Sequence, residues 1–225
     1  IRDSNKIMQL EKEQAIFKKE RIRAERKIAA GQGEIEKAKR TEANLMRDLE
    51  YINSYNGTKA TLLLSLPQAT TEEVGRELHR IAKTYRNEAY GTVGTYAGLN
   101  LLVRSEYSID GTFDRNTFFV EGISGLKYRC GLSGALPLGF VESAQYPHGA
   151  LSKLPSLIEK QQKAVERIES EIPTLQDIIC RQWSKADELS RLKQECKELQ
   201  HRIDESLKET GQPQAAKHEA IAEAA

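Results

Sequence analysis

The sequence is poor in the residues that build metal sites and membrane spans. It has three cysteines, Cys130, Cys180 and Cys196, and none of them forms a CxxC pair. Zinc hooks and ribbons need such pairs, and an odd, scattered set of thiols is typical of a reducing cytoplasm. No apolar run reaches the roughly 18 residues that a membrane-spanning helix requires. We therefore expect a cytoplasmic chain with no membrane partner, no metal and no cofactor of its own.

Aromatic residues are also scarce, at 6% of 225 residues, whereas charged residues make up 30%. This balance is typical of long, solvent-exposed helices. The net charge of +1 does not indicate a globally basic nucleic-acid binder. However, residues 1–54 carry 13 basic and 10 acidic side chains, whereas residues 151–225 carry 12 and 14. Ends of opposite charge bias favour two helical arms that pair with each other.

Heptad-spaced apolar residues occupy both ends of the chain. In residues 6–53, ten of fourteen positions spaced alternately by three and four are apolar: Ile7, Leu10, Gln14, Phe17, Arg21, Ala24, Ile28, Gly31, Ile35, Ala38, Glu42, Leu45, Leu49 and Ile52. This spacing predicts a coiled-coil seam. The period returns after Leu151 and continues in shifted phase through Leu189, Leu192, Cys196, Leu199 and Ile203. Pro173 interrupts the second arm and predicts a kink or a new helix start there.

The middle of the chain shows signals of a mixed fold. The apolar run 60–66 predicts a strand, and Thr70 with Glu73 has the spacing of a helix capping box. Residues 90–105 predict one glycine-interrupted strand or two short strands. Residues 116–131 predict a hairpin that turns at Ser124-Gly125, with Leu126, Tyr128 and Cys130 on one face and Lys127 and Arg129 on the other.

Together these signals predict an α+β protein, a long antiparallel coiled-coil helical hairpin with a small α+β head inserted at its tip. The first coiled-coil helix spans residues 1–54, the head residues 55–150, and the second arm residues 151–208, kinked or broken near Pro173. Residues 209–225 are expected to be a tail that is partly disordered or vector-derived. The alternative, in which the arms pack with partners, stays open. Because the chain begins at Ile1 without an initiator Met or a signal pattern, we expect it to be a piece of a larger polypeptide.

The glycine-rich stretch 119–134, FVEGISGLKYRCGLSG, lacks the features of a catalytic loop. Its Gly122 and Gly125 do not have the spacing of a phosphate-binding loop, and no helix follows. No spacing ties Cys130 to a histidine base, so we expect a buried, inert thiol on a strand. No GxSxG frame surrounds its serines. The sequence therefore predicts no catalytic residue.

Basic residues are the remaining candidates for function. On the first arm, a basic segment over residues 17–27 includes Lys18, Lys19 and Arg23, which would contact a DNA backbone or pair with acidic residues of the second arm. In the head, cations lie near aromatic residues, and such arginine and aromatic side chains could bind a phosphate backbone or stack on bases. The candidate nucleic-acid-binding residues of the head are Arg104, Lys127, Arg129, Tyr96 and Tyr128.

Four segments carry a family resemblance: GTVGTYAGLNLLVRSE, NTFFVEGISGLKYRCGLSG, QYPHGALSKLPSLIEKQ and WSKADELSRLKQECKELQHRI. They resemble the C-terminal region of large helicase–DNA methyltransferase fusion proteins of Bacteroides-type mobile and conjugative elements, over roughly residues 55–207. The resemblance implies a parent that acts on DNA, with an ATP-dependent helicase core and an adenine methyltransferase as a further activity. ATP and S-adenosylmethionine would be cofactors of that parent.

The sequence motifs of the helicase and of the methyltransferase do not occur in these 225 residues, which contain no GxxxxGK[ST], DEAH-like or NPPY-like sequence. The resemblance therefore implies a non-catalytic accessory module, in which a coiled-coil arm presents a head to DNA or to other domains of the parent. Two other hypotheses stay open. The chain could be a structural element that forms a homodimer through its coil without touching nucleic acid, or the head could carry an enzymatic activity of its own.

Overall fold

The computed structural model describes residues 2–131 and 136–210, and within them the fold is α+β. The chain divides into two compact units, residues 1–30 with 171–225, and residues 31–170. Helices α1 (Arg2–Ser54) and α5 (Leu154–Cys180) contribute to both units, and α6 (Ala186–Thr210) belongs to the first. In the described residues no helix is long and apolar enough to cross a membrane.

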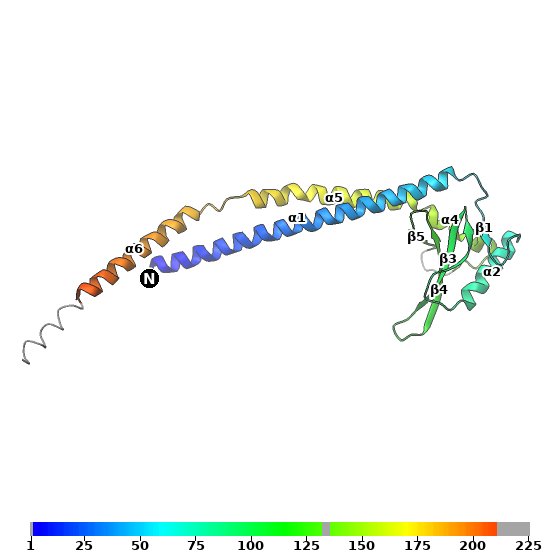
Figure 1. Ribbon diagram of the computed structural model, residues 1–225, viewed down its shortest axis with the longest axis horizontal. Helices are drawn as coiled ribbons and strands as arrows, with labels where there is room; N and C mark the ends of the chain where they lie inside the picture. The colour runs from blue at the N-terminus through cyan, green and yellow to red at the C-terminus, as the bar shows by residue number, and fades with distance from the viewer. Residues whose placement is uncertain (1, 132–135, 211–225) are drawn as a thin grey trace, which may run out of the picture. The chain divides into compact units, whose positions relative to one another are not determined.

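The second unit contains a five-stranded antiparallel sheet in which neighbouring strands follow one another in the chain (Figure 1). Its strands are β1 (Thr61–Leu63), β2 (Gly91–Tyr96), β3 (Leu99–Tyr107), β4 (Phe113–Glu121) and β5 (Lys127–Arg129). The expected strand near residue 60 is confirmed, and residues 90–105 form two strands rather than one. The division falls at Ala97 and Gly98, which both adopt positive φ angles of 50° and 73° and so permit a tight turn.

Helices cover one face of this sheet. Helix α2 (Thr71–Thr84) begins with the expected capping box, in which Thr70 and Glu73 satisfy each other's backbone N–H groups. Its residues Val74, Leu78 and Ile81 are buried against the inward side chains of the strands. Two short helices, α3 (Phe140–Ala144) and α4 (Tyr146–Leu151), complete the cover. The core of this unit also includes Leu45 of α1, Leu101 and Val103 of β3, Phe118 and Val120 of β4, and Leu154 of α5.

The hairpin of β4 and β5 turns one residue earlier than expected. The N–H of Gly125 donates to the carbonyl of Gly122, so Ile123 and Ser124 are the central residues of the turn. Gly125 then takes a φ of 83°, and the N–H of Gly122 donates to the carbonyl of Leu126. This is a three-residue hairpin loop in which the glycine supplies the left-handed residue, rather than the two-residue turn at Ser124-Gly125.

The predicted seam of α1 is buried or half-buried at all fourteen positions, including the polar ones. In the second unit, Lys39 pairs with Glu169 at 3.2 Å, and the amide of Gln162 donates to Glu42. In the first unit, Lys27 pairs with Glu171 at 3.0 Å and Lys185 with Glu13 at 2.7 Å. In each unit, therefore, polar side chains of α1 contact residues of the second arm.

The second arm is interrupted later than the sequence indicated. Helix α5 continues without a break through Pro173, and the helices separate at residues 181–185. A proline removes one backbone hydrogen bond, but the seam residues Ile172 and Leu175 beside it are half-buried and hold the helix in register. Leu189 and Leu192 of the predicted seam are buried, whereas Leu199 and Ile203 are each 52% exposed. The predicted tail beyond residue 210 lies outside the described residues.

Candidate functional site on the open sheet face

Strand alternation gives the sheet a second face, which we call the open face. It consists of Asn100, Leu102, Arg104 and Glu106 of β3, Arg115, Thr117, Phe119 and Glu121 of β4, and Lys127 and Arg129 of β5. Among the described residues, the core beneath the helices includes none of these ten side chains. Leu102 and Thr117 are buried and form the floor of the face, and charged and aromatic side chains surround them.

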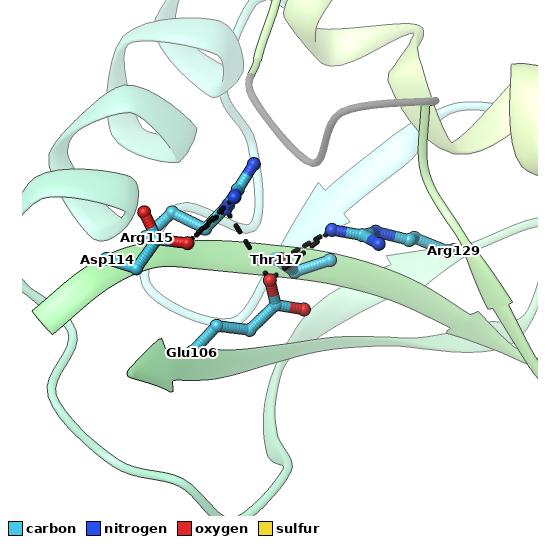
Figure 2. Close-up of polar contacts among 5 residues, drawn as sticks. All are labelled: Glu106, Asp114, Arg115, Thr117 and Arg129. Atoms are coloured by element: carbon cyan, nitrogen blue, oxygen red, sulfur yellow. Dashed lines mark hydrogen bonds and ion pairs between the residues drawn. The ribbon is translucent and has the colours of Figure 1, made fainter. Parts of the chain in front are cut away.

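Carboxylates neutralise several cations of the open face. Lys127 pairs with Glu121 at 2.9 Å, and this hydrogen bond, with a smaller one from Asn100, lowers the pKa of Glu121. Figure 2 shows the Glu106 carboxylate beside two guanidinium groups, that of Arg115 at 3.6 Å and that of Arg129 at 3.4 Å. These side chains are a quarter to two-fifths exposed, so the pairs contribute little to stability but fix where the cations lie.

Arg104 differs from these cations because it faces an aromatic ring. Its guanidinium lies 5.5 Å from the ring centre of Tyr90, the residue before β2, and Lys127 Nζ lies 5.1 Å from the same ring. Phe119 meets Tyr90 edge to face, with ring centres 5.3 Å apart. In the described part of the chain, Arg104 has no carboxylate within ion-pair distance, and its buried Nε has no hydrogen-bond partner. The open face thus places Arg104, which no carboxylate neutralises, beside Tyr90, a residue that is 40% exposed.

The structure brings together three of the predicted head residues and separates two others from them. Arg104, Lys127 and Arg129 share the open face, as their positions on β3 and β5 require. Tyr96 and Tyr128 lie apart from these cations, because both side chains point to the helix-covered face and are only 4% and 6% exposed. Neither ring can stack on a ligand base from there.

Both buried tyrosines have structural partners. The hydroxyl of Tyr96 lies 3.1 Å from Nδ1 of His148, and burial raises the pKa of Tyr96. The hydroxyl of Tyr128 donates to the carboxylate of Asp48 on α1. Burial, and then that hydrogen bond, raise the pKa of Tyr128. These contacts hold the sheet to its surrounding helices.

The basic residues predicted on the first arm lie in the other unit. Lys18, Lys19 and Arg23 are exposed side chains of α1. In the same basic segment, Lys27 pairs with Glu171, as expected for a coiled-coil flank that meets an acidic partner arm. This pairing accounts for one cation of the segment, and DNA contact by Lys18, Lys19 and Arg23 stays a prediction.

A cavity of about 420 Å³ lies in the second unit. Its lining includes His148 and Tyr96, but within the described ranges it includes neither Cys130 nor a carboxylate. Cys130 follows the last residue of β5 and is buried in the core, and burial raises the pKa of its thiol to about 12. Elsewhere in residues 2–131 and 136–210, no group of three or more His, Cys, Asp or Glu side chains is placed to hold a metal ion. Among the described residues, therefore, this cavity does not bring the Cys130 thiol together with a histidine and a carboxylate.

Sequence reasoning missed Tyr90, Phe119 and Asp48. Phe119 lies two residues before Glu121 on β4, so strand periodicity puts both side chains on the same face. Asp48 lies three residues after Leu45 and four before Ile52, which places it on the buried side of α1. Tyr90 carries no such signal, because its contact with Lys127 depends on the register of four strands.

Comparison with known proteins gives one finding about this part of the chain. Residues 47–151 match the model of a family described as a domain of unknown function (DUF8438). The DUF8438-like region begins one residue before Asp48 and ends at Leu151, the last residue of α4, so it contains the whole open face. No curated protein and no solved structure matches the chain.

Proposed function

We propose that this chain is a non-catalytic accessory module that contacts DNA through the open face of its sheet. The observation that carries the proposal is that Arg104 of β3 and Lys127 and Arg129 of β5 share a face of the sheet that helices leave uncovered. Cations gathered on one surface are the electrostatic feature that binds a phosphate backbone. Glu106 and Glu121 reduce the charge of the face, so we expect weak binding that depends strongly on salt.

We further propose that α1 and the second arm form one long antiparallel coiled-coil hairpin with the sheet unit at its tip. The buried seam of α1 and the ion pairs within each unit support this arrangement. Carried by a helicase–methyltransferase-like parent, which the sequence resembles, such an arm would set the distance between the head and the enzymatic domains. The other domains of that parent are then further partners, and ATP and S-adenosylmethionine belong to them.

The salt dependence of DNA binding tests the proposal quantitatively. If the three cations each neutralise one phosphate, the affinity should fall roughly 15- to 40-fold between 50 and 200 mM salt, which follows from a slope of about −0.7 to −0.9 per contact. Fluorescence anisotropy with a labelled oligonucleotide measures this slope. A salt-independent affinity would contradict a phosphate-contacting face.

A pair of matched charge reversals locates the site. The variant Lys127→Glu/Arg129→Glu should abolish most of the binding. Its control, Arg76→Glu/Arg80→Glu, makes the same change of charge on α2, which covers the opposite face of the sheet. The control cations are also paired with carboxylates, Glu72 and Glu77, so the two variants disturb comparable ion pairs. Equal losses in both variants would mean that overall charge, and not the open face, governs binding.

Exposed apolar side chains on α6 favour a second candidate function, that of a structural coiled-coil element that dimerises. Leu199 and Ile203 are each 52% exposed and Leu207 is 65% exposed, at intervals of four residues along one side of the helix. Sedimentation equilibrium separates the candidates. Concentration-dependent dimerisation that Leu199→Ser/Ile203→Ser removes, together with no DNA binding, would favour the structural function.

A further inference from the structure

We propose that the open face selects single-stranded nucleic acid, with an unpaired base stacked on Tyr90 and its phosphate held by Arg104. This inference rests on the proposed DNA contact and goes beyond it, because it names the form of nucleic acid and the residue that discriminates. In a duplex, the base faces are hidden by stacking on neighbouring base pairs, whereas an unpaired base can stack on a protein ring.

Tyr90 has the features of a stacking platform. The residue is 40% exposed although it lies beside a sheet, and the edge-to-face contact with Phe119 at 5.3 Å holds the orientation of its ring. Phe119 is half-buried and sits on β4 directly opposite Leu102, a buried residue of the floor. A ring supported from below in this way loses little conformational freedom when a base covers it.

Arg104 supplies the charge that a stacked nucleotide needs. The other cations of the open face are engaged by carboxylates: Lys127 by Glu121, and Arg115 and Arg129 by Glu106. Among the described residues Arg104 has no such carboxylate, and its guanidinium lies 5.5 Å from the ring centre of Tyr90. A phosphate bound by Arg104 therefore displaces no carboxylate and lies next to the base on Tyr90.

The side chains of the site converge on one ring although they come from different strands. Tyr90 precedes β2, whereas Phe119 and Lys127 belong to β4 and β5. The ring centre of Phe119 lies 5.3 Å from that of Tyr90, and Lys127 Nζ lies 5.1 Å from it. The site is therefore compact, and a single nucleotide stacked on Tyr90 would lie beside both Arg104 and Lys127.

The test compares a labelled single-stranded DNA 12-mer with the duplex of the same sequence, using the whole chain and anisotropy at low salt. We expect the single strand to bind at least about ten-fold more tightly. Tyr90→Ala should weaken single-strand binding by about 5- to 150-fold, the range of one base–aromatic stack, and leave duplex binding unchanged. Tyr90→Phe, which keeps the ring, should retain the affinity of the natural protein. Arg104→Gln should also weaken single-strand binding.

Tyr107 provides a matched control, since it is 37% exposed and meets Phe113 edge to face at 5.9 Å, much as Tyr90 meets Phe119. Tyr107→Ala should therefore bind the single strand normally. If circular dichroism shows that Tyr90→Ala does not fold, Tyr90→Leu removes the aromatic ring while keeping apolar volume and carries the same expectation.

The outcomes separate this inference from the function on which it rests. Equal binding of duplex and single strand, with Tyr90→Ala neutral and Lys127→Glu/Arg129→Glu deleterious, would overturn the stacking inference and leave the DNA-contact function standing. Binding of neither form would overturn both. Equal losses in Tyr90→Ala and Tyr107→Ala would also overturn the inference, because the effect would then not be specific to the open face.

Discussion

The carboxylate of Asp48 should be one of the most sensitive positions in the chain. It is fully buried on α1 and accepts hydrogen bonds from the backbone N–H of Ser124 at 2.8 Å, from the hydroxyl of Ser124 at 2.6 Å, and from the hydroxyl of Tyr128. A Cβ at Gly122 would lie 2.0 Å from the same carboxylate, so only glycine permits this approach. Asp48 thus fastens the hairpin of β4 and β5 to the helix.

The structure sets the expected cost of Asp48→Ala. The substitution leaves the Ser124 N–H and the Tyr128 hydroxyl without their acceptor, and each buried unsatisfied donor costs about 1–3 kcal/mol. The free energy of unfolding should therefore fall by about 2–6 kcal/mol, a large part of the ~5–15 kcal/mol typical of a domain. The melting temperature should fall by roughly 4–24 °C, at about 2–4 °C per kcal/mol for a chain of this size.

Urea denaturation followed by circular dichroism measures this loss, with Glu50→Ala as control. Glu50 is an exposed carboxylate two residues further along α1, and its removal should change stability by less than about 0.5 kcal/mol. Tyr128→Phe should cost less in the Asp48→Ala background than in the natural protein, since the hydroxyl has already lost its acceptor. If Asp48→Ala is as stable as Glu50→Ala, the buried network does not hold the hairpin and the reasoning fails.

Three further predictions concern close packing at two glycines, the burial of a thiol and the lowered pKa of a carboxylate. Gly75→Ala should destabilise the protein although alanine favours helix, because the added Cβ would lie 1.9 Å from a backbone oxygen of α3. Gly33→Ala on α1, where nothing lies within 4 Å of the added Cβ, should instead raise the free energy of unfolding by about 0.5–1 kcal/mol. Thermal melts of the two variants measure both changes. Iodoacetamide at pH 8 should label exposed Cys180 and spare buried Cys130, because a pKa of about 12 leaves roughly one Cys130 thiol in 10⁴ ionised. Peptide mass spectrometry measures the labelling of each cysteine, and equal labelling of the two would contradict the prediction. Acid should weaken the fold, because the pKa of Glu121 is lower in the folded state than in the unfolded chain. The stability that Glu121 contributes is therefore present above about pH 4.5 and is lost as the pH falls through the lowered value. Thermal melts over a pH series should show the natural protein and Glu121→Gln becoming equally stable at low pH.

Local periodicity predicted the parts of the fold that depend only on nearby residues. The seam of α1 could be read because each buried position is fixed by a step of three or four residues along one helix. The capping box at Thr70 is likewise a contact over three residues. In contrast, Pro173 misled the prediction, because half-buried neighbours can hold a helix together across a missing hydrogen bond, and the true interruption at residues 181–185 carries no proline.

The candidate site depended on strand pairing, which the sequence predicts less well. The alternation of Lys127 and Arg129 with Tyr128 was correct, yet nearness in sequence made Tyr128 and Tyr96 seem to belong with the cations. The pleat sends neighbouring residues to opposite faces, so these two tyrosines are buried beneath the helices. Tyr90 reaches Lys127 only because β2, β3, β4 and β5 pair in that order, and a shift of one residue in any pair would move it to the other face.

Asp48 also bears on where the head begins. A boundary at residue 55 follows from the turn signals after α1, but it assigns Leu45 and Asp48 to the arm, whereas both are buried against the sheet unit. A fragment cut at 55 would leave the Tyr128 hydroxyl without its acceptor and expose the core residues that Leu45 covers. The DUF8438-like region begins at residue 47 and so retains Asp48. Because α1 supplies both a buried carboxylate and an apolar side chain to the sheet, its last turns are part of the head's core rather than a support on which a separate domain rests.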